Sequence, residues 1–200
     1  MKHLSYILGL VVLTMVATTS FASILIDESA PVGNRYKRSR DLETDLKAKK
    51  KVGVSSTVAG AFGLFGVGID LNFTRDVAFS IGAGLSQNFS AFNMNMKFAL
   101  SDGSFQPYFV GGISRWSANG SNGEITHSTP GFLESKFLSD SERRSGKFAK
   151  NIIYPGLGLQ YLNTSGDLEG LGYFAEVLMM MEISSLAVAP TGGVGAIYYF

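Results

Sequence analysis

From Val52 to the last residue, apolar residues alternate with small or polar ones in runs separated by turn-forming residues. Successive side chains of a β-strand point to opposite faces, so such alternation gives each strand one apolar face. The clearest run is Phe65–Phe73, which sets Phe, Val, Ile and Leu on one side against Gly, Asp and Asn on the other. This pattern restricts the segment to antiparallel β-structure in which every strand must shield one face from water.

The runs and the turn signals between them predict eight strands. These cover Val52–Gly60, Phe65–Phe73, Val77–Phe89, Ala91–Leu100, Gln106–Trp116, Ile152–Leu162, Leu171–Ile183 and Gly193–Phe200. We expect Asn119–Lys147 to form a long polar loop, and Ser184–Thr191 to form a second loop before the last strand. The fifth strand contains Gly111 and Gly112, which suggest a bulge, and its irregular alternation does not assign Arg115 to either face.

The polar strand faces distinguish a soluble barrel, which hides its apolar face inside, from a membrane barrel, which shows it to lipid. On the second to fourth strands this face carries mainly Gly, Ser, Ala and Asn, and its charged residues are Asp70 and Lys97. A soluble surface is typically about a quarter to a third charged. Small and amide side chains suit the narrow lumen of an eight-stranded barrel instead. We therefore expect an all-β, eight-stranded antiparallel up-and-down transmembrane β-barrel.

The last strand ends on Phe200, with Tyr198 on the same face and Tyr199 on the other. In a closed barrel the last strand pairs with the first, so no strand edge stays open. The Tyr-x-Phe ending resembles the C-terminal signature of bacterial outer-membrane barrels, which the barrel assembly machinery reads in that family. The resemblance implies that Tyr198 and Phe200 form an assembly signal.

Residues 1–22 have the pattern of a secretory signal peptide, with Lys2 before an apolar core and small residues before Ser23. The apolar core is shorter than the roughly 20 residues of a membrane-spanning helix. Residues 23–51 form a polar arm that becomes basic toward its end, and Ser39 could cap a short helix in it. We interpret the arm as a solvated linker, with a handle for an anionic surface or cell-wall polymer as the alternative.

Residues 52–200 resemble a small outer-membrane barrel of the OmpA/OmpX type. The resemblance rests on the eight alternating strands, on Pro107-Tyr108, on the run Gly156–Tyr161 and on the aromatic ending. It implies a location in the outer membrane of a Gram-negative bacterium, with lipids and the assembly machinery as partners. The arm and the C-terminus would then be periplasmic and the Asn119–Lys147 loop external. Unlike in full-length OmpA, we expect no C-terminal peptidoglycan-binding domain.

The sequence offers little support for catalysis. It has no Cys, which excludes disulfides and thiolate sites, and its formal net charge of +1 gives no reason to expect nucleic acid binding. Beyond the signal peptide the one histidine is His127, next to Ser128, whereas the lipid A deacylases need the two residues on one strand face. We expect no catalytic, cofactor-binding or metal-binding residues, and no cofactor.

The remaining interpretations differ in what the barrel does. We favour a structural or surface-interaction role with residues 119–147 as the contact surface, because an eight-stranded lumen leaves little room for water. The alternative is a narrow channel for small or apolar solutes. A lipid A or phospholipid hydrolase is the less favoured alternative.

Strand parity places three charged residues, Asp70, Lys97 and Glu176, on the inner face of the second, fourth and seventh strands. All three lie a few residues from turns at the same end of the barrel. A buried charge without a partner costs several kcal/mol. We therefore predict that Lys97 pairs with Glu176 or Asp70 across the lumen and plugs it. Glu182 shares the inner face of the seventh strand nearer the other end, in the upper lumen.

Overall fold

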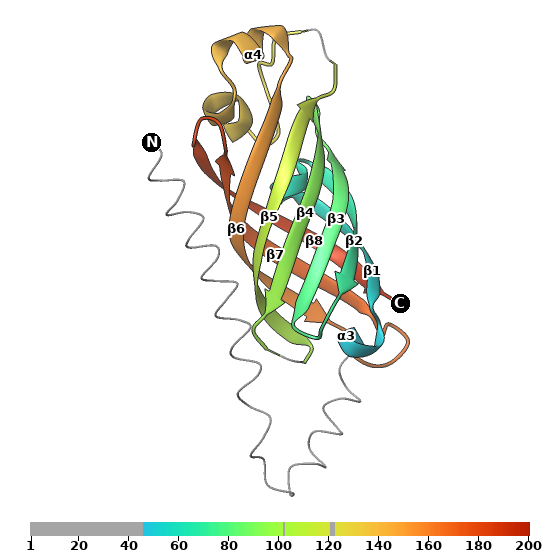
Figure 1. Ribbon diagram of the computed structural model, residues 1–200. Coiled ribbons are helices and arrows are strands. Elements are labelled where there is room, and N and C mark those ends of the chain that lie inside the picture. Colours follow the sequence, from blue (N-terminus) through green and yellow to red (C-terminus); the bar gives the residue numbers. More distant parts are fainter. Residues whose placement is uncertain (1–45, 102, 121–122) are drawn as a thin grey trace, which may run out of the picture. The chain divides into compact units, whose positions relative to one another are not determined.

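The computed structural model describes residues 46–101, 103–120 and 123–200 (Figure 1). The predicted signal peptide and most of the arm lie outside these residues. The elements are α3 (Leu46–Lys49), β1 (Val52–Ala59), η2 (Gly60–Phe62), β2 (Phe65–Asn72), β3 (Val77–Leu85), β4 (Phe89–Ala99), β5 (Phe105–Ala118), η3 (Leu133–Phe137), α4 (Asp140–Ser145), β6 (Ala149–Leu162), β7 (Leu171–Glu182) and β8 (Val188–Tyr199). None of the helices in the described part is long and apolar enough to span a membrane.

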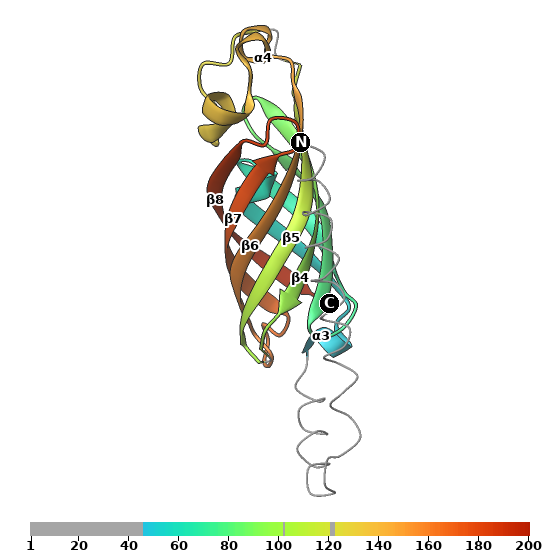
Figure 2. The same cartoon turned by 60° about the vertical axis from the view of Figure 1, so that its left-hand side comes forward.

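The eight strands form one closed barrel in which every strand pairs with its sequence neighbours and β8 pairs with β1. All pairs are antiparallel, and the closing pair sets Val54 opposite Tyr198 and Val58 opposite Val194. The predicted eight-stranded antiparallel up-and-down barrel is therefore confirmed. Figures 1 and 2 show α3 and the C-terminus at one end, here called the α3 end, and α4 at the other, here called the α4 end.

Three predictions about individual strands are wrong. The third strand ends at Leu85, and Phe89, its predicted last residue, begins β4. β8 begins at Val188, so the second half of the predicted Ser184–Thr191 loop belongs to a strand. Pro190 fits there because β1 pairs with β8 only as far as Gly193, and the missing N–H of Pro190 therefore costs no hydrogen bond. The suggested bulge at Gly111 and Gly112 is absent, since both residues keep a continuous register with β4 and β6.

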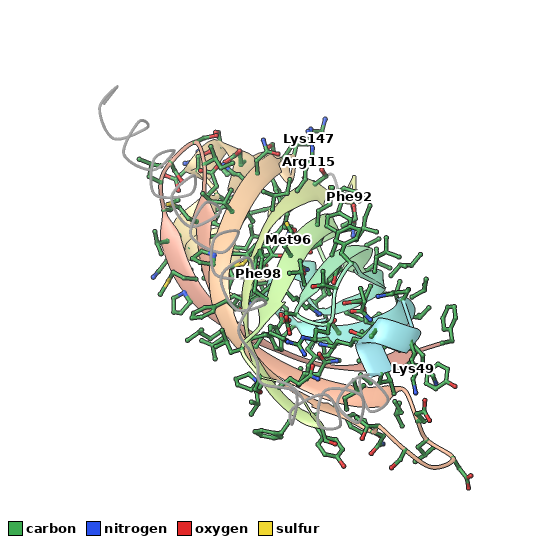
Figure 3. All side chains as sticks on the ribbon, turned by 60° about the horizontal axis from the view of Figure 1, so that its bottom comes forward. Lys49, Phe92, Met96, Phe98, Arg115 and Lys147 are labelled. Carbon is green, nitrogen blue, oxygen red and sulfur yellow. The ribbon has the colours of Figure 1, made fainter. Side chains whose placement is uncertain are left out.

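The two faces of each strand differ as the alternation predicts. Outward residues are apolar and open, with exposed fractions from 48% to 69% for Val54, Val67, Ile69, Phe92, Phe109, Leu157, Val177 and Val194. Inward residues between them are mostly buried. Figure 3 shows the side chains that stand out from the barrel wall. The barrel therefore presents its apolar face to the surroundings and its polar face to the lumen.

The connection between β1 and β2 turns into the barrel at the α4 end. Its short helix η2 is buried, and the Phe62 ring lies against Gly66 of β2 and Gly82 of β3. A Cβ atom on Gly66 would lie 2.5 Å from the Cβ of Phe62, which no side chain tolerates. The inward glycines of β2 and β3 therefore leave room for a loop that folds into the lumen.

Candidate functional site

Three charged side chains meet inside the barrel toward the α3 end, and we call Asp70, Lys97 and Glu176 the charge cluster. The Nζ atom of Lys97 lies 3.1 Å from Oδ1 of Asp70 and 3.9 Å from Oε1 of Glu176. The ammonium group also lies 4.7 Å from the centre of the Phe174 ring, within cation–π range. Strands β2, β4 and β7 thus each contribute one charged side chain to a single site in the lumen. Lys97 lies within salt-bridge distance of both carboxylates that strand parity offers as its partners.

Hydroxyl groups donate hydrogen bonds to both carboxylates of the charge cluster, those of Asp70 and Glu176. Ser55 and Ser80 donate hydrogen bonds of 2.7 and 2.5 Å to the two oxygens of Asp70, which is 0% exposed. The Tyr108 hydroxyl donates a 2.7 Å bond to Glu176. Buried charges are tolerated when they are paired and hydrogen-bonded, and both carboxylates of the charge cluster meet this condition.

The α3 end of the lumen is closed by the residues just before β1. Leu46 is buried against Leu162, Ile197 and Tyr199, and Lys47 Nζ donates a 3.2 Å hydrogen bond to Oε1 of Gln160. The interpretation of the arm as a solvated linker is therefore wrong for its last residues. A turn of helix brings an apolar side chain back into the barrel mouth, and one Leu among basic residues is a weak sequence signal for such a contact.

The α4 end is covered by residues 123–148, here called the loop cap. Leu133 and Phe137, one helical turn apart in η3, are buried with the lumen residues Phe89 and Trp116. The rings of Phe89 and Trp116 stack at 4.4 Å, and Nε1 of Trp116 donates a 3.0 Å hydrogen bond to the Ala61 carbonyl. The prediction of a simple polar loop is therefore wrong, because a few apolar residues at helical spacing pack on the barrel mouth.

The helix α4 has a complete capping box in the loop cap. The Ser139 hydroxyl accepts from the backbone N–H of Glu142, and the Glu142 carboxylate accepts from the Ser139 N–H at 2.8 Å. Lys150 Nζ lies 2.9 Å from the same carboxylate. Burial raises the pKa of Glu142, but these donors outweigh it and hold the pKa below its ordinary value. The Ser-x-x-Glu spacing was visible in the sequence and could have revealed this helix.

No protein-family model and no curated protein sequence matches the chain. Its structure is similar to the crystal structure of the N-terminal β-barrel domain of Pseudomonas aeruginosa OprF, with a TM-score of 0.54 and 13% identity over 76% of this chain and 98% of that one. A match to the Yersinia pestis outer membrane protein Ail in a phospholipid bilayer nanodisc has a TM-score of 0.39 and 16% identity over 76% of this chain and 99% of that one.

This chain has the fold of the small outer-membrane barrels of the OmpA/OmpX type. At such low identity the similarity to OprF extends to the architecture and not to individual residues. The charge cluster, the closure by α3 and the loop cap are therefore described from this barrel's own contacts.

The other singled-out residues lie apart from the charge cluster. Glu182 is buried at the end of β7, where it accepts hydrogen bonds from the backbone N–H groups of Ser184 and Ser185 and so holds the β7–β8 turn. Tyr198 and Phe200 face outward at the α3 end, with exposed fractions of 48% and 60%. The Phe200 N–H donates a 2.9 Å hydrogen bond to Val52, which ties the chain end to the first strand.

Among the described residues, no hydrogen bond or ion pair reaches the imidazole of His127. The His127 side chain is exposed, its carbonyl accepts from Asn88, and the neighbouring Ser128 hydroxyl donates to Pro130 at 3.0 Å. No group of His, Asp or Glu residues suited to a metal ion occurs among the residues that the structure describes. The arrangement as a whole can close a lumen and present an ordered surface at the α4 end.

Proposed function

We propose that the protein is an integral outer-membrane β-barrel with a structural or surface-interaction role, and that the loop cap is its contact surface. The observation that carries this proposal is the closed barrel with an apolar outer wall and a lumen that is filled along its length. The charge cluster, α3 and the loop cap all contribute to the filling.

The outer wall supports a membrane location. Exposed apolar side chains occur on all eight strands, whereas a soluble monomer rarely exposes more than a few hundred Å² of contiguous apolar surface. Outer-membrane barrels carry such a band, and their closed strand order leaves no backbone group unpaired in lipid. The fold shared with the OprF domain is consistent with this environment.

The connections support an orientation with the α3 end in the periplasm. The connections at this end, residues 73–76, 100–104 and 163–170, are short, and the chain also enters and leaves the barrel here. The loop cap belongs to the longest connection and lies at the opposite end. Short periplasmic turns with longer external loops are the usual arrangement in outer-membrane barrels.

The filled lumen supports a surface role over conduction. At the α4 end Phe89, Trp116 and Met180 are each 0% exposed, and at the α3 end the charge cluster bridges three strands. A channel for small or apolar solutes would need an open path through both groups. The Ser128 hydroxyl next to His127 donates to the Pro130 carbonyl and does not pair with the imidazole, which likewise supports a role other than hydrolysis.

Fractionation of cells that express the protein tests the location. We expect it in the outer membrane, with folded and boiled samples migrating differently on a gel. Trypsin added to intact cells should cut the loop cap, which contains exposed Lys136 and Arg144, and leave the barrel intact. A soluble periplasmic protein that is insensitive to heating would contradict the proposal.

Planar-bilayer recording tests the role of the lumen. The purified barrel should give no steady conductance, because both halves of the lumen are filled. Stable ohmic channels in the wild-type protein would favour the channel alternative.

A further inference from the structure

The outer wall of the barrel contains one charged residue that the membrane assignment does not explain. Arg115 of β5 pairs with Phe92 of β4 and Asn151 of β6, and these residues share the outward face. The next residue, Trp116, points into the lumen. Among the outward residues of strands β1–β8, Arg115 is the sole Asp, Glu, Lys or Arg. Figure 3 shows Arg115 and Phe92 on the same side of the barrel.

Nothing in the described part of the protein neutralises this charge. The Arg115 guanidinium has no ion-pair or hydrogen-bond partner among the described residues. An outward Arg costs roughly 2–4 kcal/mol at the bilayer midplane and little near an interface. Arg115 lies close to the α4 end of β5, which ends at Ala118, so its position suits the boundary between acyl chains and head groups. An anionic group at that level would supply the missing partner.

An apolar groove of about 430 Å³ lies beside Arg115 on the outer wall, within the size range of ligand pockets. The register lines up two outward rows, Val67–Ala83–Phe92–Arg115 and Phe65–Leu85–Ser90–Ser117. Small side chains in these rows form the floor, and the larger apolar ones form the walls. A groove of this kind fits a hydrocarbon chain, and the guanidinium at its edge fits an anion.

A second cation continues the outward face beyond Arg115. Lys147 is exposed and lies four residues before Asn151, the β6 partner of Arg115, and a strand rises about 3.3 Å per residue. The Cα atoms of the two residues are therefore about 13 Å apart along the wall. Figure 3 shows Lys147 and Arg115 near each other at the same end of the barrel. This separation suits a head group that carries two phosphates better than one with a single phosphate.

We propose that the groove is a binding site for a phosphorylated glycolipid of the outer leaflet, the lipid A part of lipopolysaccharide. Arg115 binds one phosphate, and Lys147 lies within reach of the second. One acyl chain lies in the groove against Ala83. The assignment to the outer leaflet rests on the proposed orientation in the outer membrane. Because the site lies on one side of the barrel, a bound lipid A molecule would hold a fixed position on the outer wall at β2–β5.

Binding of diphosphoryl lipid A to the barrel, measured by native mass spectrometry in a neutral detergent, tests the charged half of the site. Arg115→Gln should weaken binding about tenfold or more, because it removes charge-assisted hydrogen bonds. Arg75→Gln is the matched control, since Arg75 lies in the β2–β3 turn at the α3 end, and it should leave the affinity unchanged. Lys147→Gln should have a smaller effect that disappears with monophosphoryl lipid A.

A pair of Ala→Phe variants tests the apolar half. Ala83→Phe fills the floor of the groove and should weaken lipid A binding severalfold. Ala175→Phe adds the same ring to the outward face of β7, away from the groove, and should not. Both changes are on the outer wall, so both variants should still migrate as heat-modifiable barrels on a gel.

The outcomes separate this site from the proposed function. A wild-type protein that fails to form a heat-modifiable barrel in lipid contradicts the proposed function. A folded barrel that binds lipid A equally with Gln or Arg at position 115 overturns the site and leaves the membrane assignment in place. Equal binding of phosphatidylglycerol at the same concentration would also overturn it, because a general anionic-lipid contact needs no second phosphate.

Discussion

The two halves of the lumen are filled in different ways by the same eight strands. Toward the α4 end the largest inward side chains are apolar, including Phe89, Trp116 and Met180, and the loop cap adds Leu133 and Phe137 to them. Toward the α3 end the charge cluster and its hydroxyl partners fill the lumen next to a smaller apolar cluster that contains Leu46. One half therefore resembles the hydrophobic core of a soluble protein, and the other is built around a buried polar network.

The change occurs within single strands. β4 carries inward Lys97 toward the α3 end and inward Phe89 at the α4 end, and β7 carries inward Glu176 and then Met180. Apolar packing tolerates moderate changes of shape, whereas a charge network depends on every member being satisfied. The comparison therefore predicts that single substitutions are more damaging in the charge cluster than in the apolar half.

The largest effect is expected for Lys97→Ala, which leaves Asp70 and Glu176 buried without their cation. Breaking a buried ion pair typically costs about 3–5 kcal/mol of unfolding free energy. Urea unfolding of the barrel in lipid vesicles measures this loss. Lys136→Ala, on the exposed loop cap, should change the free energy by less than about 0.5 kcal/mol. The triple variant Asp70→Asn, Lys97→Met, Glu176→Gln should recover much of the stability, and failure to do so would mean that packing rather than charge dominates.

A somewhat smaller effect is expected for Leu133→Ala in the apolar half. Leu133 is 0% exposed, and its truncation should cost about 2–4 kcal/mol, mainly as loosening of the loop cap. Faster trypsin cleavage of the loop cap, with the barrel strands still protected, is the expected observation. Leu168→Ala provides the same change at a 59% exposed position near the α3 end and should have no such effect. Global unfolding in the Leu133 variant would show that the cap and the barrel form one cooperative unit.

Acidification should affect the loop cap weakly. The pKa of Glu142 is held below its ordinary value. Its ionised form therefore stabilises the folded cap fully at any pH above the ordinary pKa of a glutamate. This contribution is lost as the pH falls through the lowered pKa. The rate of loop-cap cleavage by an acid-active protease should rise over this range in the wild type, and Glu142→Gln should flatten the dependence. An unchanged pH dependence in that variant would assign it to other carboxylates.

The smallest effect on folded-state stability is expected for removal of Phe200. Its side chain is 60% exposed and its N–H makes one hydrogen bond to Val52, so the formed barrel should lose about 1 kcal/mol or less. If the ending acts as an assembly signal, the yield of folded barrel in cells should fall much further. Deletion of one residue from the loop cap is the control. Equal yields for the two deletions would count against the signal.

The strands and their faces could be predicted from the sequence because a period of two runs through residues 52–200 with little interruption. The same parity placed Asp70, Lys97 and Glu176 on the inner face. The packing of the loop cap was missed because Leu133 and Phe137 are outnumbered by polar neighbours, and two apolar residues one helical turn apart are too short a pattern to predict burial. The contact of Leu46 with the barrel mouth was missed for the same reason.

Other features depend on pairing partners that the sequence does not specify. Pro190 lies in β8 because β1 ends before it, which only the register reveals. The outward face of Arg115 follows from its pairing with Phe92, whereas the glycines before it interrupt the alternation in the sequence. The sequence of one strand therefore does not predict the environment of a residue when that environment depends on the paired strand.

The central claim is that each strand shows its apolar face to lipid and its other face to a filled lumen. Because the chain has no Cys, single cysteines at Val177 and Leu178 of β7 can carry spin labels without a background signal. In lipid vesicles the label at position 177 should be accessible to oxygen dissolved in the bilayer. The label at position 178 should be protected from oxygen and from a water-soluble nickel reagent. Access of the nickel reagent to position 178, or equal oxygen access at both positions, would contradict the account.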